Sequence, residues 1–471
     1  MASLVDIRAW QIPIPDLALL AGVHVLLIAQ YYVLSKLAAR SPWRRPLGYL
    51  AQVALVLLPL GFRSRHSGLS QAVVTVLAFY FTLKQLEATA TYGYYQRDLP
   101  VAGSSNGEGI ADTTAPNDSK STRRLPLNLR EYLIQVLRSH PSPASAKSFP
   151  YLQPGFHPDP TPTATGYYDL VTGDTLTATA AANLTDVKMP VANRLRSVAR
   201  WTNDPPAALC QRLHLTGYFY YLAQAALYSL GVILLVRGQL LHPSLADPSA
   251  ARRHYQTTTF PAPLTWSWAV DSYSSAFLFY WGMNVWFNLA YGGAAWYLGF
   301  PMPVLFDNPF LATSPRDFWS RRWNILFKDA FHVVVFLPVY RRLAGLVNRS
   351  VAMTVAALAV FLFSALMHEY VLICIAGRSN AEELAFFAVH GLLTCGQVLA
   401  QQTLQRYAVG TLFPPSVRQA WAWFNRTPMA TLACIILNIY LLLWTGPLFL
   451  HPYLRNGFHV FLAPLYFPHH S

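Results

Sequence analysis

A histidine and a glutamate, His368 and Glu369, interrupt the apolar stretch VAMTVAALAVFLFSALMHEYVLICIAG. An ionisable side chain inside an apolar helix of membrane length is costly to bury, and such a residue usually serves chemistry or ion passage. A neutral imidazole can accept the proton of an alcohol as that alcohol attacks a carbonyl carbon. We therefore expect His368 to be a general base, although it could simply hydrogen-bond a neighbouring helix. Glu369 could be its partner or only an acid near a helix end.

Two adjacent arginines, Arg321 and Arg322, lie upstream in the segment NPFLATSPRDFWSRRWN, which spans 308–324. A guanidinium can hold a phosphate group by paired hydrogen bonds, and a nucleotide-bearing thioester donor carries such phosphates. Arg316 or Lys328 could add to this basic group. The alternative left open is that these residues only anchor helix ends and set the membrane topology.

Amide and aromatic side chains of the same segment suit the remaining needs of an acyl transfer. Asn324 can donate a hydrogen bond to a developing oxyanion or help to orient the histidine. Trp319 and Trp323 could line an apolar slot for an acyl chain or an acceptor, or could belong to an interfacial aromatic belt. We expect His332 and His390 to be structural, because neither has a polar constellation beside it in the sequence.

The composition of the 471-residue chain is that of a polytopic membrane protein. The chain is 54% hydrophobic and 12% charged, whereas a soluble domain carries about 25% charged residues. Its net charge of +14 would suit nucleic-acid binding, but the basic residues lie in loops between apolar segments, which is typical of membrane topology. The four cysteines form no CxxC pair, so neither a zinc site nor a disulfide framework is predicted.

Apolar stretches predict an all-α integral membrane protein with about eight transmembrane helices, or up to about ten. The predicted spans are 17–35, 46–62, 69–86, 213–236, 264–299, 351–375, 383–402 and 430–450. The stretch 264–299 could be one tilted span or a span followed by a re-entrant piece. The segment 331–346 is short and could be re-entrant or interfacial.

The chain divides into three parts by composition. Residues 1–86 hold the first three spans, 87–212 form a partly low-complexity insert, and 213–471 form the catalytic membrane core. Within the insert, 125–139 and 189–201 have the pattern of amphipathic segments that lie on a membrane surface. A solvated connector is the equally weighted alternative.

Basic residues predict the orientation of the eight-span arrangement. They are concentrated in the loops of one side, which include 87–212 and 300–350, and the positive-inside rule places these loops in the cytosol. Both termini then lie in the lumen, and the RRWN motif lies at the cytosolic face of the membrane. We expect a multi-pass protein of the endoplasmic reticulum.

The segments NPFLATSPRDFWSRRWN and FSALMHEY together resemble the paired signatures of the membrane-bound O-acyltransferase superfamily, in its wax-synthase-like branch. The matching positions are Pro309, Phe310, Ser314, Asp317, Phe318, Trp319, Arg321, Arg322, Trp323, Asn324, Ser364, His368 and Glu369. The resemblance implies that His368 is the catalytic histidine and Asn324 the catalytic loop amide. It also implies an intramembrane tunnel that acyl-CoA enters from the cytosol and the acceptor enters from the membrane. Ser320 and Ala365 stand where the family often has glycine.

The function that this resemblance implies is acyl transfer from CoA to a hydrophobic alcohol, with no tightly bound cofactor and no metal. Substrates would contact Trp319, Arg321, Arg322, Trp323, Ser364 and Glu369. Fungal-type members with a low-complexity insert before the fourth span lead us to expect acetyl transfer from acetyl-CoA to a terpenoid-type secondary metabolite. Long-chain wax-ester synthesis is the alternative. A membrane transporter is the alternative of another class, and it is disfavoured because one span alone is clearly unusual.

Overall fold

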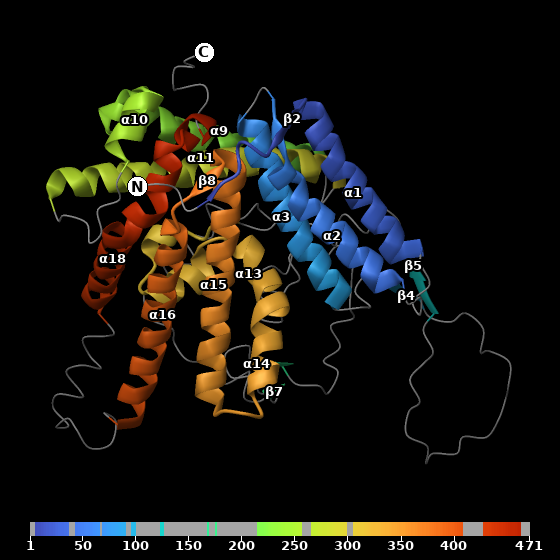
Figure 1. The fold of residues 1–471 in the computed structure, drawn as a ribbon. Coiled ribbons are helices and arrows are strands. Elements are labelled where there is room, and N and C mark those ends of the chain that lie inside the picture. Colours follow the sequence, from blue (N-terminus) through green and yellow to red (C-terminus); the bar gives the residue numbers. More distant parts are fainter. Residues whose placement is uncertain are drawn as a thin grey trace. The chain divides into compact units, whose positions relative to one another are not determined.

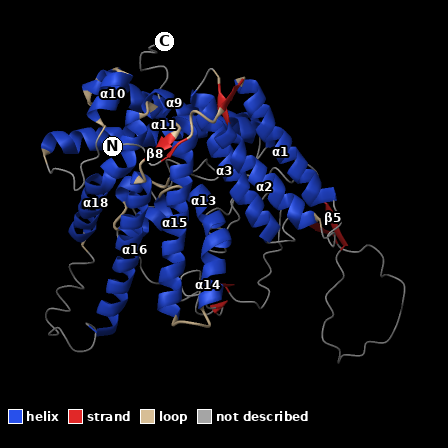
Figure 2. Ribbon diagram, in the orientation of Figure 1, coloured by secondary structure: helices blue, strands red, loops and turns tan. Residues whose placement is uncertain are grey.

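The computed structural model describes eleven stretches of the chain: 5–36, 43–65, 68–90, 96–99, 123–126, 167–168, 175–176, 214–256, 265–298, 305–407 and 427–462. They are mostly helical, as the composition predicts (Figures 1 and 2). Their strands are two to four residues long and form four pairs: β1 (Val5–Asp6) with β8 (Arg378–Ser379), β2 (Ile12–Ile14) with β3 (Phe62–Ser64), β4 (Gln96–Leu99) with β5 (Arg123–Pro126), and β6 (Tyr167–Tyr168) with β7 (Thr175–Leu176).

Two compact units make up the chain: one comprises Gln11–Arg138, and the other comprises Met1–Trp10 with Ser139–Ser471. The boundary between them therefore falls inside the insert that composition assigns to 87–212. Most of that insert lies outside the described residues. So do both predicted amphipathic segments, apart from 125–126 in β5.

The smaller unit consists mainly of three helices, α1 (Asp16–Lys36), α2 (Arg44–Gly61) and α3 (Gly68–Ala90). Asp16, at the start of α1, accepts hydrogen bonds from the hydroxyls of Ser64 at 2.6 Å and Ser70 at 2.8 Å. A carboxylate at a helix N-terminus also complements the helix dipole. These contacts fix the ends of the three helices against one another.

In the larger unit, α9 (His214–Arg237) packs along α11 (Trp266–Leu298). Gly231 permits this close approach, because a Cβ atom there would lie 2.8 Å from the indole of Trp281. Helix α11 is continuous from Trp266 to Leu298, so the stretch 264–299 forms one long helix rather than a span followed by a re-entrant piece. Two short elements, η2 (Pro243–Ala246) and α10 (Pro248–His254), connect α9 toward α11.

Three long helices carry the candidate site: α15 (Arg349–Ala376), α16 (Glu382–Tyr407) and α18 (Pro428–Arg455), followed by the short α19 (Phe458–Leu462). Helix α16 packs against both α15 and α18 (Figure 1). The Asn348 side chain caps α15 by accepting from the Val351 N–H at 3.0 Å. Gly377 ends the same helix in the left-handed region, at a φ of 73°, where glycine has no Cβ penalty.

A chain of short elements precedes α15: η3 (Pro309–Leu311), α12 (Pro315–Asp317), η4 (Phe318–Arg322), α13 (Ile325–Phe331), η5 (His332–Phe336) and α14 (Leu337–Leu343). The η4 and η5 turns are π-helical, a rare conformation that is frequent at functional sites. Since η5 and α14 pack against α15, the segment 331–346 contributes to the helical bundle.

Five of the described helices are long and apolar enough to cross a membrane, and they indicate a multi-pass membrane protein. These candidate spans are Asp16–Val33, Tyr218–Arg237, Arg349–Ala376, Glu382–Thr403 and Pro428–Arg455. Two of the other predicted spans correspond to the shorter apolar helices Pro46–Gly61 and Ser70–Lys84, and the third to α11. The total of about eight spans stays a prediction, as does the intramembrane tunnel.

Candidate active site around His368

His368 lies on α15 inside a cluster of aromatic rings contributed by α16 and α18. Its imidazole stacks on Phe387, with ring centroids 4.7 Å apart and an angle of 21° between the planes, and meets Phe449 edge-on at 5.3 Å. Its Nδ1 atom lies 3.2 Å from the Tyr453 hydroxyl. Within the described residues this is the hydrogen bond that His368 makes, so Nε2 is left for a reactant.

The loop that precedes α13 folds back on itself between residues 305 and 325. The Asp307 N–H donates to the Arg322 carbonyl at 2.8 Å, and the Ile325 N–H donates to the Leu305 carbonyl at 2.9 Å. Aromatic rings pack within this closed loop: Phe306, Phe318 and Trp323. The loop thereby satisfies its own backbone groups, and Trp323 contributes to its interior packing.

Arg322 holds this loop together from inside. Its Nε atom donates to Asp317 Oδ2 at 2.8 Å, and one terminal nitrogen donates to the carbonyls of Asp307 and Asn308, both at 3.2 Å. The side chains of the ion pair are only 4% and 8% exposed. Arg322 was expected to contact substrate. The structure instead engages its guanidinium within the protein.

Arg321, by contrast, is exposed, and it lies near Arg316. Burial and the positive charge of Arg321 lower the pKa of the Arg316 guanidinium below its ordinary value. Two cations that repel each other form a natural site for an anion. The two residues that sequence spacing could not tell apart, Arg321 and Arg322, therefore face different surroundings.

The loop packs against the middle of the helices and not against their ends. The ring of Trp319 lies 5.8 Å from that of Phe361, near the middle of α15. The backbone N–H of Arg316 donates to Gln397 Oε1 at 3.2 Å, near the middle of α16. The loop therefore lies beside the middle turns of both helices, and its place at the cytosolic face of the membrane stays a prediction.

A directional chain of hydrogen bonds fixes Trp319 to two helices through His390. The indole N–H of Trp319 can only donate, and it donates to His390 Nδ1 at 3.1 Å. His390 Nε2 must then carry the ring proton and donate it to Thr445 Oγ1 at 2.8 Å. The Thr445 hydroxyl donates in turn to the Leu441 carbonyl at 2.9 Å. The structure thus gives His390 the structural role expected for it, between η4, α16 and α18.

Asn324 occupies the turn between η4 and α13, with a left-handed φ of 47°. Within the described residues, its buried Oδ1 atom has no hydrogen-bond partner. A buried amide oxygen without a partner is rare and calls for a functional explanation. Two ring contacts hold this turn against α15: Trp319 with Phe361 before the turn, and Phe331 with Phe363 after it. Phe361 and Phe363 both lie within two helical turns of His368.

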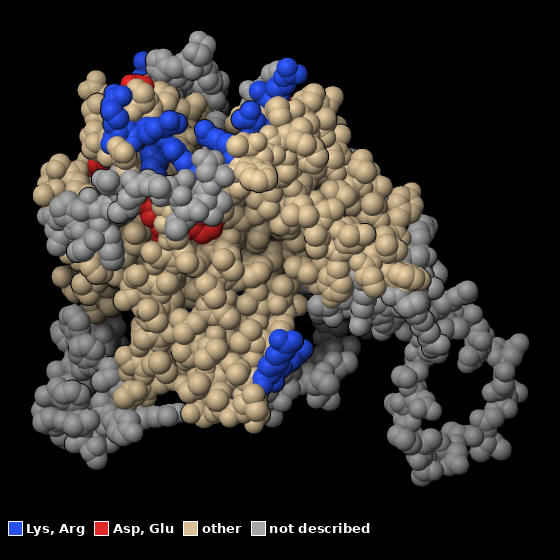
Figure 3. Space-filling view, viewed as in Figure 1, with Lys and Arg blue, Asp and Glu red and all other residues tan. Residues whose placement is uncertain are grey.

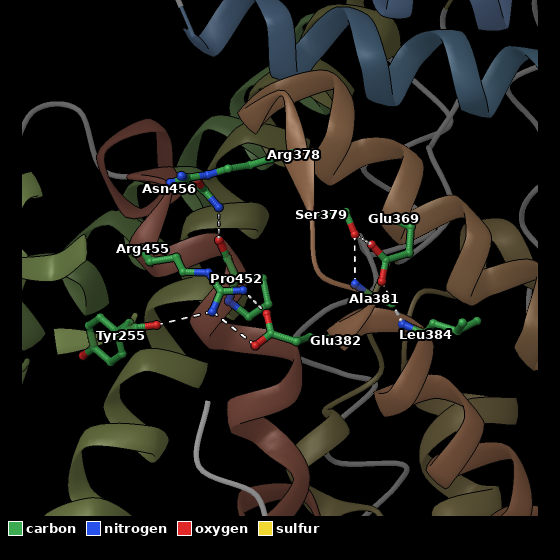
Figure 4. Close-up of polar contacts among 10 residues, drawn as sticks. All are labelled: Tyr255, Glu369, Arg378, Ser379, Ala381, Glu382, Leu384, Pro452, Arg455 and Asn456. Atoms are coloured by element: carbon green, nitrogen blue, oxygen red, sulfur yellow. Dashed lines mark hydrogen bonds and ion pairs between the residues drawn. The ribbon is translucent and has the colours of Figure 1, made fainter. Parts of the chain in front are cut away.

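Glu369 caps the N-terminus of α16. Its Oε1 atom accepts from the Leu384 N–H at 3.0 Å, and its Oε2 atom accepts from the Ser379 hydroxyl, as Figure 4 shows. Both oxygens are therefore engaged by protein groups, and Glu369 joins the end of α15 to the start of α16. It was expected to bind substrate. Ser364, also expected to bind substrate, lies one turn before His368 on α15 and is partly buried.

A second polar network joins the end of α18 to the turn between α15 and α16 (Figure 4). Arg455 forms an ion pair with Glu382 and donates to the Tyr255 carbonyl at 3.4 Å. Arg378 donates to the side-chain oxygen of Asn456 at 3.2 Å. This network fixes the last turn of α18, which carries Tyr453.

Sequence patterns do not identify Tyr453, Thr445 or Glu383 as site residues. Tyr453 and Thr445 lie in a largely apolar run, Glu383 stands beside Glu382 at the start of another, and no local motif marks any of the three. The rotation of α18 about its axis decides which of its side chains meet α15, and that rotation is set by packing. Among the described residues, no group of three or more His, Cys, Asp or Glu side chains is placed to hold a metal ion.

Comparison with known proteins gives one family match: residues 302–389 match the membrane bound O-acyl transferase family. The probable long-chain-alcohol O-fatty-acyltransferase 2 of Arabidopsis thaliana is 32% identical over 163 residues, which are 34% of this chain and 42% of that protein. The long-chain-alcohol O-fatty-acyltransferase of Simmondsia chinensis is 33% identical over 108 residues, or 23% of this chain and 31% of that one.

A third relative is the acyl-CoA–sterol O-acyltransferase 1 of Arabidopsis thaliana, which is 29% identical over 100 residues. That match covers 21% of this chain and 29% of the relative. The matched part of the chain thus spans less than half the length of each of these relatives. The region that holds the candidate site, with the RRWN loop and His368, is similar to membrane-bound O-acyltransferases, in their wax-synthase-like branch.

Proposed function

We propose that the chain is an acyl-CoA-dependent O-acyltransferase that esterifies a hydrophobic alcohol, with His368 as the general base. The observation that carries this proposal is the setting of His368. Its imidazole is held by Phe387, Phe449 and Tyr453 on packed helices, while Nε2 is left for a reactant. The similarity of residues 302–389 to the membrane bound O-acyl transferase family supports the same chemistry.

The reaction needs a proton to leave the alcohol and reach the leaving sulfur. His368 Nε2 takes the proton from the hydroxyl while the alcohol oxygen bonds to the thioester carbonyl carbon. The tetrahedral oxyanion then collapses, the carbon–sulfur bond breaks, and the CoA thiolate takes the proton back from His368. The products are an ester and free CoA. The base is neutral again after each turnover.

Asn324 is the residue that we propose to stabilise the oxyanion. Its buried side-chain oxygen has no partner within the described residues. The oxygen and nitrogen of an amide exchange places by a rotation, so this position can present an N–H donor to a negatively charged oxygen. A donor of this kind is worth about 10²–10³ in kcat. We therefore expect Asn324→Ala to lower kcat by about that factor.

The donor's phosphates fit the exposed Arg321 together with Arg316. The two guanidinium groups are close enough to repel each other, and a bound phosphate removes that repulsion. Arg322 and Glu369 have their polar atoms engaged by the protein, so we assign them the task of holding the loop and the α15–α16 junction. Trp319 and Trp323 contribute to the packing of the loop. The parts of their indole rings that other side chains do not cover can contact an acyl chain.

The acyl length and the acceptor are the finer part of the proposal. The relatives' names refer to long-chain alcohols, fatty acyl groups and a sterol, which favours wax-ester synthesis or a related long-chain reaction. The acetyl transfer to a terpenoid that the sequence led us to expect finds no support among those names. We therefore favour a long-chain acyl-CoA and a long-chain or sterol-like alcohol.

The test is a matrix of donors and acceptors with the protein in microsomes. Labelled acetyl-CoA and palmitoyl-CoA are each offered a long-chain alcohol, a sterol and a terpenoid alcohol, with protein-free microsomes as the control. Ester from palmitoyl-CoA alone supports the long-chain reading, and ester from acetyl-CoA alone restores acetyl transfer. No ester above the control in any combination contradicts the proposed function.

A further inference from the structure

The side chain of Tyr453 is held rigidly beside His368. Its ring contacts Phe279, Phe449 and Phe458, with centroids 5.6, 5.4 and 5.2 Å away. The residue is only 4% exposed, and its hydroxyl lies 3.2 Å from His368 Nδ1. A phenol fixed in this way can hold the imidazole in one orientation.

Glu383, in the first turn of α16, is a buried acid with unused acceptors. Its side chain is fully buried, and within the described residues neither carboxyl oxygen has a hydrogen-bond partner. Glu383 lies one helical turn before Phe387, the residue that stacks on His368, and it is close enough to Tyr453 and Glu369 to interact with both electrostatically. Because an unpaired buried carboxyl is costly, its presence beside the site points to a task.

The other charged groups near Tyr453 and His368 are already engaged. Glu369 accepts from Ser379 and Leu384, and Arg455 is paired with Glu382. His390 uses both of its ring nitrogens, on Trp319 and Thr445. His451, on α18, is partly buried and its Nδ1 atom lacks a partner among the described residues, but its ring contacts Tyr255. Glu383 is therefore the acid with free acceptors next to Tyr453.

We propose that Tyr453 and Glu383 are positioning residues that fix the tautomer of His368, with Nδ1–H donating to the Tyr453 oxygen and the Tyr453 hydroxyl directed at Glu383. This inference rests on the proposed function, because it assumes that Nε2 is the atom that accepts the alcohol proton. A neutral imidazole carries one ring proton, so Nε2 can act as a base only when Nδ1 carries that proton.

The direction of the hydrogen bonds follows from this requirement. When Nδ1–H donates to the phenol oxygen, the phenol proton must point elsewhere. Glu383 offers carboxyl oxygens that no hydrogen bond engages within the described residues. A bond from the Tyr453 hydroxyl to one of these oxygens holds the phenol oxygen toward Nδ1, so Glu383 acts on His368 through the orientation of Tyr453.

The test measures kcat and KM for acyl-CoA with the purified full-length protein carrying Tyr453→Phe, Glu383→Leu or both changes. Tyr453→Phe keeps the ring and its packing, and Glu383→Leu removes the acceptor oxygens while keeping a similar side-chain volume. Each is expected to lower kcat at least about tenfold and to leave KM unchanged. The loss should be smaller than the factor of about 10²–10⁴ that a general base contributes. The double variant is expected to lose no more than Tyr453→Phe alone, because Glu383 acts through Tyr453.

A matched control separates positioning from structure. Tyr291→Phe removes another buried hydroxyl, one without a partner among the described residues. This control is not expected to change kcat in protein that remains folded. Placed in a His368→Ala background, Tyr453→Phe is expected to cause no further loss of residual activity, whereas a purely structural tyrosine would cause one.

The inference is overturned if Tyr453→Phe keeps the wild-type kcat, or if its effect persists undiminished in the His368→Ala background. If Tyr453→Phe does not fold, Glu383→Leu decides on the same criteria. Full activity of His368→Ala itself would contradict the general-base proposal. Loss of activity in His368→Ala with unchanged kcat in both positioning variants would contradict the inference alone.

Discussion

At the scale of single residues, adjacent side chains of the same type have different tasks. Arg322 is buried and bonded to Asp317 and two carbonyls, whereas Arg321 is exposed beside Arg316. The π-helical turn η4 separates their directions. The consequence is that one arginine stabilises the loop while its neighbour is available to a phosphate group.

Replacing each arginine by alanine should therefore give opposite phenotypes. Arg322→Ala removes the ion-pair partner of the buried Asp317 carboxylate, which costs about 3–5 kcal/mol, so the yield of folded protein and its thermal midpoint should fall. Arg321→Ala should keep the midpoint and raise KM for acyl-CoA. Thermal unfolding in detergent and steady-state kinetics measure the two effects. A raised KM without destabilisation in Arg322→Ala would contradict this division.

At the scale of elements, the loop and the three long helices are joined by polar contacts that cross between them. The Trp319–His390–Thr445 chain links η4, α16 and α18, and Glu369 links α15 to α16. Within a membrane, cross-helix hydrogen bonds of this kind supplement van der Waals packing. They give the site a fixed geometry that the apolar surfaces alone would not specify.

Breaking the Trp319–His390–Thr445 chain should loosen the loop. Trp319→Phe and Thr445→Val each leave a nitrogen of His390 unpaired, at a cost of about 1–3 kcal/mol. Both should lower the thermal midpoint and reduce kcat. Thr354→Val is the matched control, because the Thr354 hydroxyl bonds to the Ser350 carbonyl of its own helix. An equal loss of stability in the control would show that the Trp319–His390–Thr445 hydrogen bonds have no special role.

The junction of α15 and α16 depends on the charge of Glu369. Glu369→Gln keeps the side-chain volume but weakens the bonds from Ser379 and the Leu384 N–H. We expect a loss of about 1–3 kcal/mol of stability with KM for acyl-CoA unchanged in the folded fraction. Unchanged stability together with a raised KM would return Glu369 to the substrate-binding group.

The parts of this site that sequence predicts are those with local signals. The apolar run around His368 and the RRWN segment are read directly from composition and spacing. The partner of His368 could not be predicted, because Tyr453 lies on a different helix whose rotation depends on packing with Phe279 and Phe458. The burial of Arg322 depends on the fold-back of the loop, and the capping by Glu369 depends on how α16 returns beside α15. Both are tertiary features.

At the scale of the whole chain, the larger unit carries basic side chains at two opposite levels. Figure 3 shows them around α10 and β8 and again at the end of α14, with uncharged surface between. The α10 group includes Arg252 and Arg253, and the α14 group includes Arg341 and Arg342. An uncharged band between two charged levels is the arrangement expected of a membrane-embedded surface.

The orientation predicted from the basic loops can be tested by labelling single cysteines. In a variant whose native cysteines are replaced, Gly345→Cys should react with an impermeant maleimide in sealed microsomes, since 300–350 is expected to be cytosolic. Arg253→Cys should react only after permeabilisation. Both positions are exposed. The reverse pattern of labelling would invert the predicted topology.

The role of His368 as general base is tested by comparing purified wild-type and His368→Ala proteins with their preferred acyl-CoA and alcohol. We expect the substitution to lower kcat by about 10²–10⁴ and to leave the elution profile and the thermal midpoint unchanged. His24→Ala is the control, since His24 is exposed on α1 and bonds to the Leu20 carbonyl of its own helix. Ester formation by folded His368→Ala at the wild-type rate would contradict a catalytic role for His368.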